Sequence, residues 1–320
     1  MGQRDLGILI PTRQAVLASF ERPPLDECWQ LAQAADQNGL SSVWVGDSIT
    51  AKPRLEALTT LAYLAALTQN VRLGTAVLLP FLRQPVALAH SLFNIDQISK
   101  GRLIVGVGVG ASGPGNVAEA EALGTSVKVR ARRTEDALTV MRELAAGKPV
   151  TREGKGYRLN EITVGPLPYQ KPTPPVWITA GNSGKILPEQ VDRVARFGDG
   201  IIATQVTPEV VRQVREELGP ALAAKGRDLA TMDFSVYCTV RLDDDRARAQ
   251  QAIDDFVKAY YGFQVKERGA AVGPAEEAIK VITGFWDAGA NHVIVRFAGN
   301  DQMAQTERFI REVWSQLARS

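Results

Sequence analysis

Two glycine-rich segments carry the clearest chemical signals in this sequence of 320 residues. The first, Gly108 to Gly115, follows the apolar run 103–107, and the second, Gly181-Asn182-Ser183-Gly184-Lys185, follows the apolar run 176–180. Glycine lets the backbone come close to a bound molecule. Free N–H groups where a helix begins, with a serine hydroxyl and an ammonium group nearby, suit a phosphate. We therefore expect the first loop to make room for a flat ring or its phosphate, and the second turn to open a helix and bind a phosphate.

Each glycine segment has a competing interpretation. Residues 108–113 match G-x-G-x-x-G, the form of a dinucleotide fingerprint. That fingerprint opens straight into a helix, whereas Pro114-Gly115-Asn116 are expected to prolong the loop, and no acidic residue ends a second strand about 20 positions on. A glycine loop without a ligand is the other alternative there. For the second segment the alternative is an ordinary turn in which Ser183 is the N-cap of a helix.

Conventional catalytic groups are scarce. Asp47, followed by Ser48, ends the apolar run 42–47 and is the best-placed acidic candidate, with capping of its own loop as the alternative role. His90 falls inside an expected helix and His292 begins an expected strand, so structural roles are predicted for both. The sequence has no G-x-S-x-G, no H-E-x-x-H and no acidic cluster with metal-ligand spacing, which predicts no metal site. So few acids and bases indicate that a cofactor performs the reaction.

Composition limits the class of protein. The chain is 45% hydrophobic and 22% charged, typical of a globular protein with a sizeable core. Its net charge is +2 without a basic stripe, so nucleic acid is not an expected partner. Cys28 and Cys238 lack C-x-x-C spacing and are expected to be reduced core cysteines. No signal peptide and no stretch of 18 apolar residues is present, so we expect a cytoplasmic protein without a membrane partner.

Short apolar runs alternate with helical patterns along the whole chain. Strands are expected at 6–11, 42–47, 71–79, 103–107, 176–180, 200–204, 234–242 and 292–297. Helices are expected around 28–39, 54–69, 85–99, 137–147, after 184, and around 211–222, 244–261, 274–288 and 301–317. This pattern favours the α/β class, as one (β/α)8 TIM barrel over residues 1–320, with a doubly wound sheet as the runner-up. Segment 148–175, crowded with Gly, Pro and Thr, is expected to be a hairpin or excursion.

Several motifs in combination resemble one known family, the bacterial luciferase-like flavin-dependent oxidoreductases. The motifs are NGLSSVWVGDS (38–48), TQNVRLGTAVLLPFLRQPVALAH (68–90), NIDQISKGRLIVGVGVG (94–110), RARRTEDAL (130–138), GPLPYQKPTPPVWITAG (165–181) and RVARFGDGII (193–202). Together they cover most of the chain. The resemblance implies a (β/α)8 barrel with insertion segments that binds reduced FMN or coenzyme F420 at the carboxyl ends of its strands.

The resemblance also implies roles for particular residues. It places Asp47 and Ser48 near the reactive ring, and Thr75, Ala76 and Val77 beneath it, with a non-proline cis peptide joining Ala76 to Val77. The expected contacts to the rest of the cofactor are Gly108, Val109 and Gly110 along its tail and Gly181, Asn182, Ser183 and Gly184 at its phosphate. Two departures stand out: many members carry His where this chain has Ser48, and deazaflavin dehydrogenases often place Glu near Ala111.

The function expected from this resemblance is a luciferase-like monooxygenase or hydride-transfer enzyme acting on a small organic substrate. Segments 148–173 and 262–273 are candidates to cover the mouth of the barrel. A homodimer is expected because the family is often dimeric, and a flavin reductase is a candidate partner. The alternatives are a non-catalytic flavin-binding protein of the same fold, motivated by Ser48, and a cofactor-free lyase or aldolase.

Overall fold

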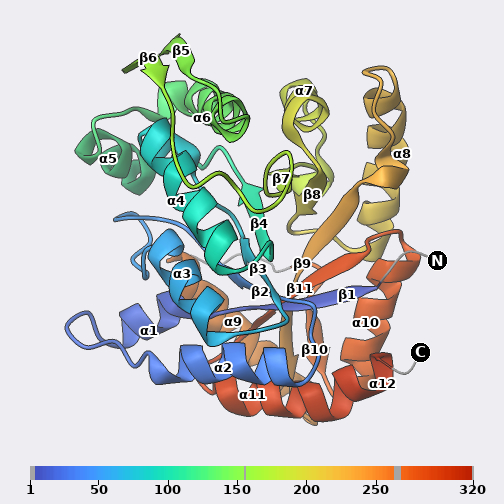
Figure 1. The fold of residues 1–320 in the computed structure, drawn as a ribbon. Coiled ribbons are helices and arrows are strands. Elements are labelled where there is room, and N and C mark those ends of the chain that lie inside the picture. Colours follow the sequence, from blue (N-terminus) through green and yellow to red (C-terminus); the bar gives the residue numbers. More distant parts are fainter. Residues whose placement is uncertain (1–3, 155, 263–267, 319–320) are drawn as a thin grey trace.

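Eight parallel strands close into a barrel in the computed structural model, which describes residues 4–154, 156–262 and 268–318 (Figure 1). The barrel strands are β1 (Asp5–Leu9), β2 (Ser42–Val45), β3 (Arg72–Thr75), β4 (Leu103–Val107), β7 (Val176–Thr179), β8 (Gly200–Ala203), β9 (Asp233–Leu242) and β11 (His292–Phe297). Each pairs with the next in this order, and β11 returns to pair with β1. The short strand β10 (Ala271–Gly273) pairs in parallel with the carboxyl end of β9. The (β/α)8 prediction is confirmed and the doubly wound alternative is wrong.

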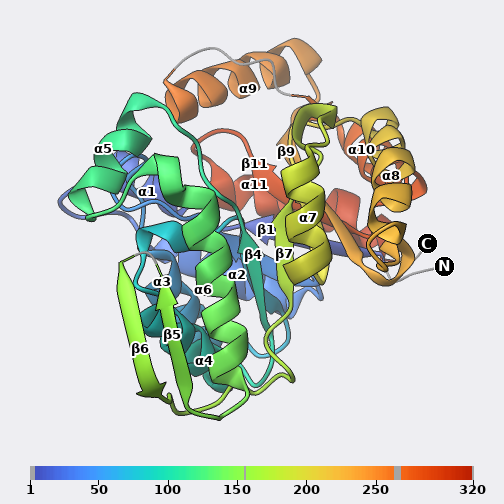
Figure 2. The same ribbon diagram turned by 90° about the horizontal axis from the view of Figure 1, so that it is seen from above.

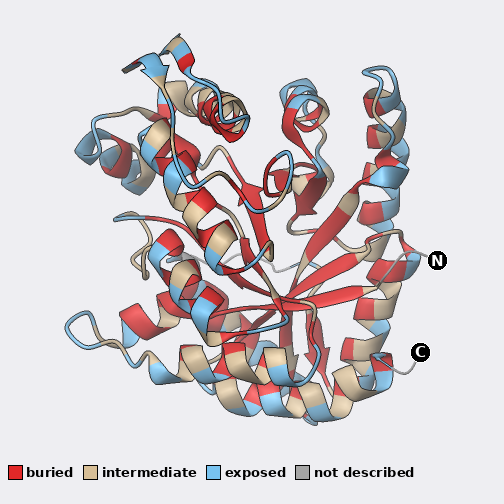
Figure 3. Ribbon diagram, in the orientation of Figure 1, coloured by how far each residue is buried: buried red, intermediate tan, exposed pale blue. Residues whose placement is uncertain are grey.

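Helices surround the barrel, and the helical faces that are buried in Figure 3 point toward the strands. The α-helices are α1 (Thr12–Ala18), α2 (Asp26–Gln37), α3 (Ala57–Leu67), α4 (Pro85–Ile98), α5 (Pro114–Ala122), α6 (Arg130–Ala145), α7 (Pro188–Phe197), α8 (Pro208–Ala223), α9 (Arg246–Tyr261), α10 (Ala275–Asp287), α11 (Gln302–Phe309) and α12 (Ser315–Leu317). A π-helical turn, Ile310–Trp314, joins α11 to α12, and short 3-10 turns are η1 (Pro80–Leu82), η2 (Val127–Val129), η3 (Asn182–Gly184) and η4 (Leu229–Thr231). Four of the α-helices begin with proline, whose fixed φ and missing N–H suit the first helical position.

The inside of the barrel is a small layered core. Successive strand residues point to opposite faces, so His292, Ile294 and Arg296 of β11 share the inward face while Val293 and Val295 pack outward against the helices. Two tryptophans, one from β2 and one from β7, fill the lower layer. The rings of Trp44 and Trp177 have centroids 5.2 Å apart, and each packs nearly perpendicular to the His292 ring.

Glycines on the neighbouring strands make room for these two rings. A Cβ atom on Gly74 would lie 2.1 Å from the Trp44 ring, and one on Gly200 would lie 2.5 Å from the Trp177 ring. Only glycine fits beside each indole without displacing it. The packed lower layer leaves the carboxyl ends of the strands as the end of the barrel where a ligand can enter.

The segment 148–175 contains an antiparallel hairpin of β5 (Val150–Gly154) and β6 (Tyr157–Ile162). From there the chain runs along α4, where the carbonyl of Leu167 accepts from Gln97, and reaches the start of β4, where Gln170 donates to the carbonyl of Leu103. Leu167 and Gln170 thus lie along α4 and at the start of β4, and the covering role of the segment stays a prediction. In the other expected cover, 262–273, residues 263–267 lie outside the described part, and β10 pairs with β9.

Two helices are absent from the pattern read in the sequence. α1 follows β1 directly, and α5 begins at Pro114, where the loop after β4 was expected to continue. α6 begins at Arg130, seven residues before the expected stripe. Figure 2 shows α5 and α9 on the same side of the molecule, near α1. These helices frame the site described next.

Candidate functional site

A cavity of about 250 Å³ opens at the carboxyl ends of the barrel strands. Residues from the barrel rim, from α5 and from α9 line it: Asp47, Ser48, Lys52, Arg54, Ala76, Val77, Leu79, Gly110, Ala111, Asn116, Thr204, Gln205, Tyr237, Tyr260 and Arg296. Five of the residues expected from the sequence are among them: Asp47, Ser48, Ala76, Val77 and Gly110. This is the end of a (β/α)8 barrel where ligands bind.

The peptide bond between Ala76 and Val77, directly after β3, is cis as expected. Hydrogen bonds fix the chain on both sides of it: the Ala76 N–H donates to the carbonyl of Val45 at 2.7 Å, and the Leu78 N–H donates to the carbonyl of Gly106 at 2.7 Å. The Thr75 hydroxyl is fully buried and donates to the same Gly106 carbonyl at 2.7 Å. Thr75 therefore supports this wall of the cavity from behind, while Ala76 and Val77 face the opening.

The glycine loop after β4 packs against this wall. A Cβ atom on Gly108 would lie 2.7 Å from the Val77 side chain, and Gly110 has a φ of +74°, which favours glycine. The close approach expected at Gly108 is thus an approach to Val77. Of the three residues expected along the cofactor tail, only Gly110 reaches the cavity. The expectation that Pro114 prolongs the loop is wrong, since Pro114 begins α5.

The second glycine segment differs from its expected geometry. It forms η3, and the next α-helix begins only at Pro188, so Ser183 is not the N-cap of a helix. The N–H groups of Ser183, Gly184 and Lys185 donate to the carbonyls of Thr204, Gly181 and Asn182. Three backbone donors that were expected to meet a phosphate are therefore used within the chain. The side chains of Ser183 and Lys185 are exposed.

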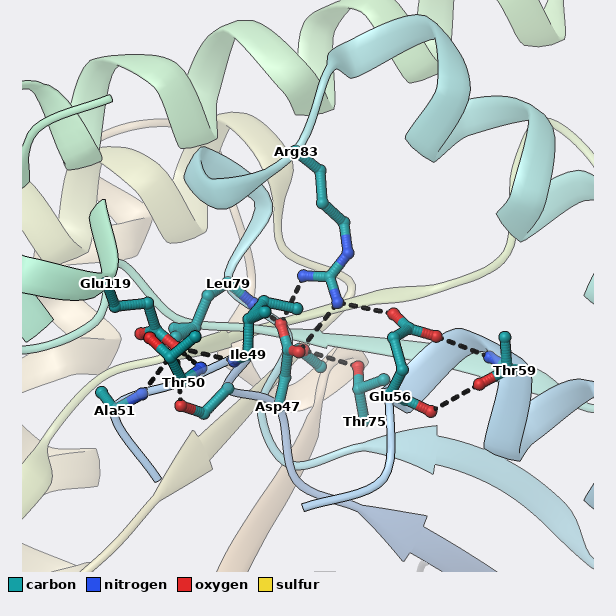
Figure 4. A network of polar contacts seen from close by, with 12 residues as sticks. Asp47, Ile49, Thr50, Ala51, Glu56, Thr59, Thr75, Leu79, Arg83 and Glu119 are labelled. Atoms are coloured by element: carbon teal, nitrogen blue, oxygen red, sulfur yellow. Dashed lines mark hydrogen bonds and ion pairs between the residues drawn. The ribbon is translucent and has the colours of Figure 1, made fainter. Parts of the chain in front are cut away.

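Asp47 lies at the rim, but its carboxylate belongs to an ion pair (Figure 4). Arg83 donates from Nη1 to Oδ2 at 2.6 Å and from Nη2 to Oδ1 at 2.8 Å, and the Leu79 N–H donates to Oδ2 at 2.9 Å. Arg83 also contacts Glu56 at 2.7 Å, and the two carboxylates raise the pKa of Arg83 against the effect of its burial. This network ties the loop after β2 to the chain after β3.

Ser48 is held by a carboxylate that the sequence did not point to. Glu119 of α5 accepts from the Ser48 hydroxyl at 2.8 Å through Oε1, and the Ser48 oxygen in turn accepts from the Lys52 N–H at 2.9 Å. The signal for Glu119 was weak, because its helix was expected to be a loop. α5 thus connects the glycine loop with the loop after β2.

The opposite side of the cavity is cationic and aromatic, and sequence reasoning missed it. Lys52 and Arg54 come from the loop after β2, Arg296 from β11, Tyr237 from β9 and Tyr260 from α9. One signal was available. Arg296 is the charged residue of the apolar strand 292–297 and shares the inward face with His292.

Metal sites, cysteines and membrane-spanning helices were also considered among the described residues. Within residues 4–154, 156–262 and 268–318, no group of three His, Cys, Asp or Glu side chains is placed to hold a metal ion. Cys28 and Cys238 are both buried and free, and burial raises the pKa of the Cys28 thiol to about 12. No helix of the described part is long and apolar enough to pass through a lipid bilayer.

Known proteins resemble this chain over nearly its whole length. The F420-dependent glucose-6-phosphate dehydrogenase of Kineococcus radiotolerans is 27% identical over 338 residues, covering 95% of this chain and 96% of that protein. Monooxygenase RslO1 from Streptomyces bottropensis has a TM-score of 0.81 at 24% identity, covering 98% of this chain and 99% of that one.

A third similar structure is the oxygenating constituent of 3,6-diketocamphane monooxygenase from Pseudomonas putida, in complex with FMN. It has a TM-score of 0.74 at 16% identity, covering 97% of this chain and 96% of that one. The model of the luciferase-like monooxygenase family matches residues 4–313, and the chain therefore belongs to this family.

Proposed function

We propose that this protein is an oxidoreductase that binds reduced FMN or coenzyme F420 at the barrel mouth and acts on a small organic substrate. The observation that carries the proposal is the cavity at the carboxyl ends of the strands, in a chain that belongs to the luciferase-like family. The names of its relatives, which include dehydrogenases, reductases and monooxygenases, favour an enzyme over a non-catalytic flavin-binding protein.

One wall of the cavity fits a planar ring. Ala76, Val77, Gly110 and Ala111 present small side chains and backbone there, so a flat ring system can lie against them. When bound, a reduced flavin or deazaflavin supplies a hydride, and a reduced flavin also activates O₂. The chain's contribution is to orient the ring and exclude water from it. Thr75 acts in this indirectly, by fixing the backbone behind the wall.

The remaining cofactor contacts follow the family resemblance. Gly108 and Val109 lie along the tail, and the turn from Gly181 to Gly184 holds the phosphate. Because three N–H groups of this turn bond within the chain, we assign the phosphate contact to the Ser183 hydroxyl and the Lys185 ammonium. Asp47 and Ser48 shape the rim near the ring.

Three further points belong to the proposal. A homodimer through α2 and α3 is supported by the half-exposed Tyr63, whose ring lies 4.7 Å from that of Trp29. With FMN as the cofactor, a flavin reductase would supply the reduced form. The two free cysteines fit a cytoplasmic location.

Titration of the purified protein with FMN, with reduced FMN and with F420 tests the proposal, because each cofactor is followed by its own absorbance. The variant Ala111→Trp fills the cavity from an exposed loop position and should abolish binding. Ser112→Trp, one residue further along the same loop, does not line the cavity and is the matched control. Binding of none of the three cofactors by the folded wild-type protein would overturn the proposal.

A further inference from the structure

The rim of the barrel divides into two halves of different chemistry. Around the barrel, the ends of β3 and β4 contribute only uncharged residues to the cavity. The half formed by β11, β1 and β2 contributes three cations, Lys52, Arg54 and Arg296. Asp47 is the sole carboxylate among the described lining residues, and both of its oxygens are bonded to Arg83.

Arg54 is the central member of the cationic half. No carboxylate of the described residues lies within ion-pair distance of its guanidinium, and its Nε donates to the carbonyl of Lys52 at 3.1 Å. The guanidinium rests over Gly46, where a Cβ atom would lie 1.8 Å from Nη1. Because Gly46 has no side chain, the Arg54 guanidinium can lie against the backbone at this position beside the cavity.

Arg296 brings a second guanidinium to the cavity from the barrel itself. It is only 4% exposed, and Nη2 donates to the Thr239 hydroxyl at 2.8 Å. Its guanidinium carbon lies 5.5 Å from the centre of the Tyr237 ring and 5.2 Å from that of the Tyr260 ring. Aromatic rings within about 6 Å of a cation stabilise its positive charge.

The pKa values of two groups that line the cavity reflect the arginine charges around it. Burial lowers the pKa of Lys52; the charge of Tyr260 opposes this effect, and the charges of Arg13 and Arg54 add to it. Burial alone would raise the pKa of the Tyr260 hydroxyl, yet the charges of Arg54, Arg296 and Arg13, together with a hydrogen bond to Arg54, outweigh burial and lower it. With three cations in its lining and its one lining carboxylate, Asp47, paired with Arg83, the cavity favours a negative charge.

We propose that Arg54, with Lys52 and Arg296, binds a carboxylate or phosphate group of the substrate, so that this oxidoreductase acts on small organic anions. The proposal rests on the proposed function, since it names the substrate class of the same site. A planar guanidinium offers parallel N–H donors that match two oxygens of either group. The anion held on the β11–β2 half places the rest of the substrate against the wall at Ala76 and Val77. An anionic part of the cofactor is the other source of such a group.

The first experiment measures anion binding without cofactor. Inorganic phosphate and succinate are titrated into the protein at low salt by calorimetry. We expect both to bind wild type, and Arg54→Gln to weaken binding about tenfold or more, the effect of losing one charge-assisted hydrogen bond. Gly46→Ala should weaken it similarly without changing any charge, because the new methyl group displaces the Arg54 guanidinium. Arg132→Gln, at an exposed position of α6, is the matched control and should bind as wild type does.

The second experiment separates the two sources of the anionic group. The dissociation constants of FMN and F420 are measured for wild type and for Arg54→Gln, and we expect them to agree. Tenfold weaker cofactor binding by Arg54→Gln would assign the cations to the cofactor and overturn the proposal. Anion binding that is absent in wild type, or unchanged in both Arg54→Gln and Gly46→Ala, would also overturn it. A protein that binds anions but no cofactor would contradict the proposed function and leave the anion site standing.

Discussion

The Ser48 hydroxyl donates a hydrogen bond of 2.8 Å to Oε1 of Glu119, a residue 71 positions further along the chain. The same oxygen accepts from the N–H groups of Ile49, Thr50 and Ala51 at 2.6, 2.8 and 3.2 Å (Figure 4). Burial raises the pKa of this carboxyl, but the hydrogen bonds outweigh burial and lower it. One ionised carboxylate, 1% exposed, thus organises the loop that carries Lys52 and Arg54 to the cavity.

Replacing Glu119 by alanine should therefore destabilise the protein and disorder the loop after β2. Four donors lose their common acceptor, and we expect the free energy of unfolding to fall by about 2–4 kcal/mol. Phosphate binding at Arg54 should weaken as well. Urea denaturation and the anion titration measure the two effects.

Glu121→Ala provides the control, because Glu121 is exposed on the same helix. It should change the free energy of unfolding by less than about 0.5 kcal/mol. A Glu119→Ala protein as stable as this control, with unchanged phosphate binding, would show that the loop keeps its shape without the carboxylate.

The barrel was predictable because its signals are local. Each barrel strand is a short apolar run, and proline or glycine marks many helix ends, so the strand at 292–297 agrees with β11 at both ends. α5 was not predicted because Pro114-Gly115-Asn116 has the composition of a turn. Proline is, however, also a favoured first residue of a helix, and α5 begins at Pro114. The choice between the two depends on what the helix packs against, which is tertiary information.

The site was less predictable, because its polar groups pair across long distances in the chain. Asp47 was a reasonable acid from its place after β2. Its partner Arg83, however, lies 36 residues away, between the strand expected at 71–79 and the helix expected around 85–99. The turn at Gly181 has the composition of a phosphate loop, but η3 uses its N–H groups internally. The residue types indicated where the mouth of the barrel lies. They could not indicate which carboxylates and N–H groups there already form hydrogen bonds within the protein.

The ion pair between Asp47 and Arg83 predicts that Asp47 is structural. Arg83→Met leaves a buried carboxylate without its partner, and we expect the free energy of unfolding to fall by about 3–5 kcal/mol. The double variant Asp47→Asn with Arg83→Met should lose less than the two single changes together, by at least about 1 kcal/mol. Urea denaturation of the four proteins measures this coupling.

The same variants test Asp47 as an acid or base. If its role is structural, Asp47→Asn lowers the free energy of unfolding, and the loss in kcat at saturating cofactor stays within about tenfold. A loss of kcat of more than about a hundredfold with an unchanged free energy of unfolding would instead place Asp47 in the chemical step.

Asp5, at the start of β1, makes stability depend on acid pH. Burial raises its pKa, but the neighbouring His292, whose Nδ1 lies 3.9 Å from Oδ2, and the charge of Arg72 outweigh burial and hold the pKa at about 2. Because the folded-state pKa is lower than the ordinary 3.8, the stabilisation is fully present above about pH 5 and is lost as pH falls toward 2. The shift corresponds to about 2 kcal/mol, of which about 1 kcal/mol is lost by about pH 3. Urea denaturation of wild type and Asp5→Asn at about pH 6 and about pH 3 should therefore show a smaller difference at the lower pH. Glu121→Gln is the control, and a difference that stays constant between the two pH values would contradict the ion pair with Arg72.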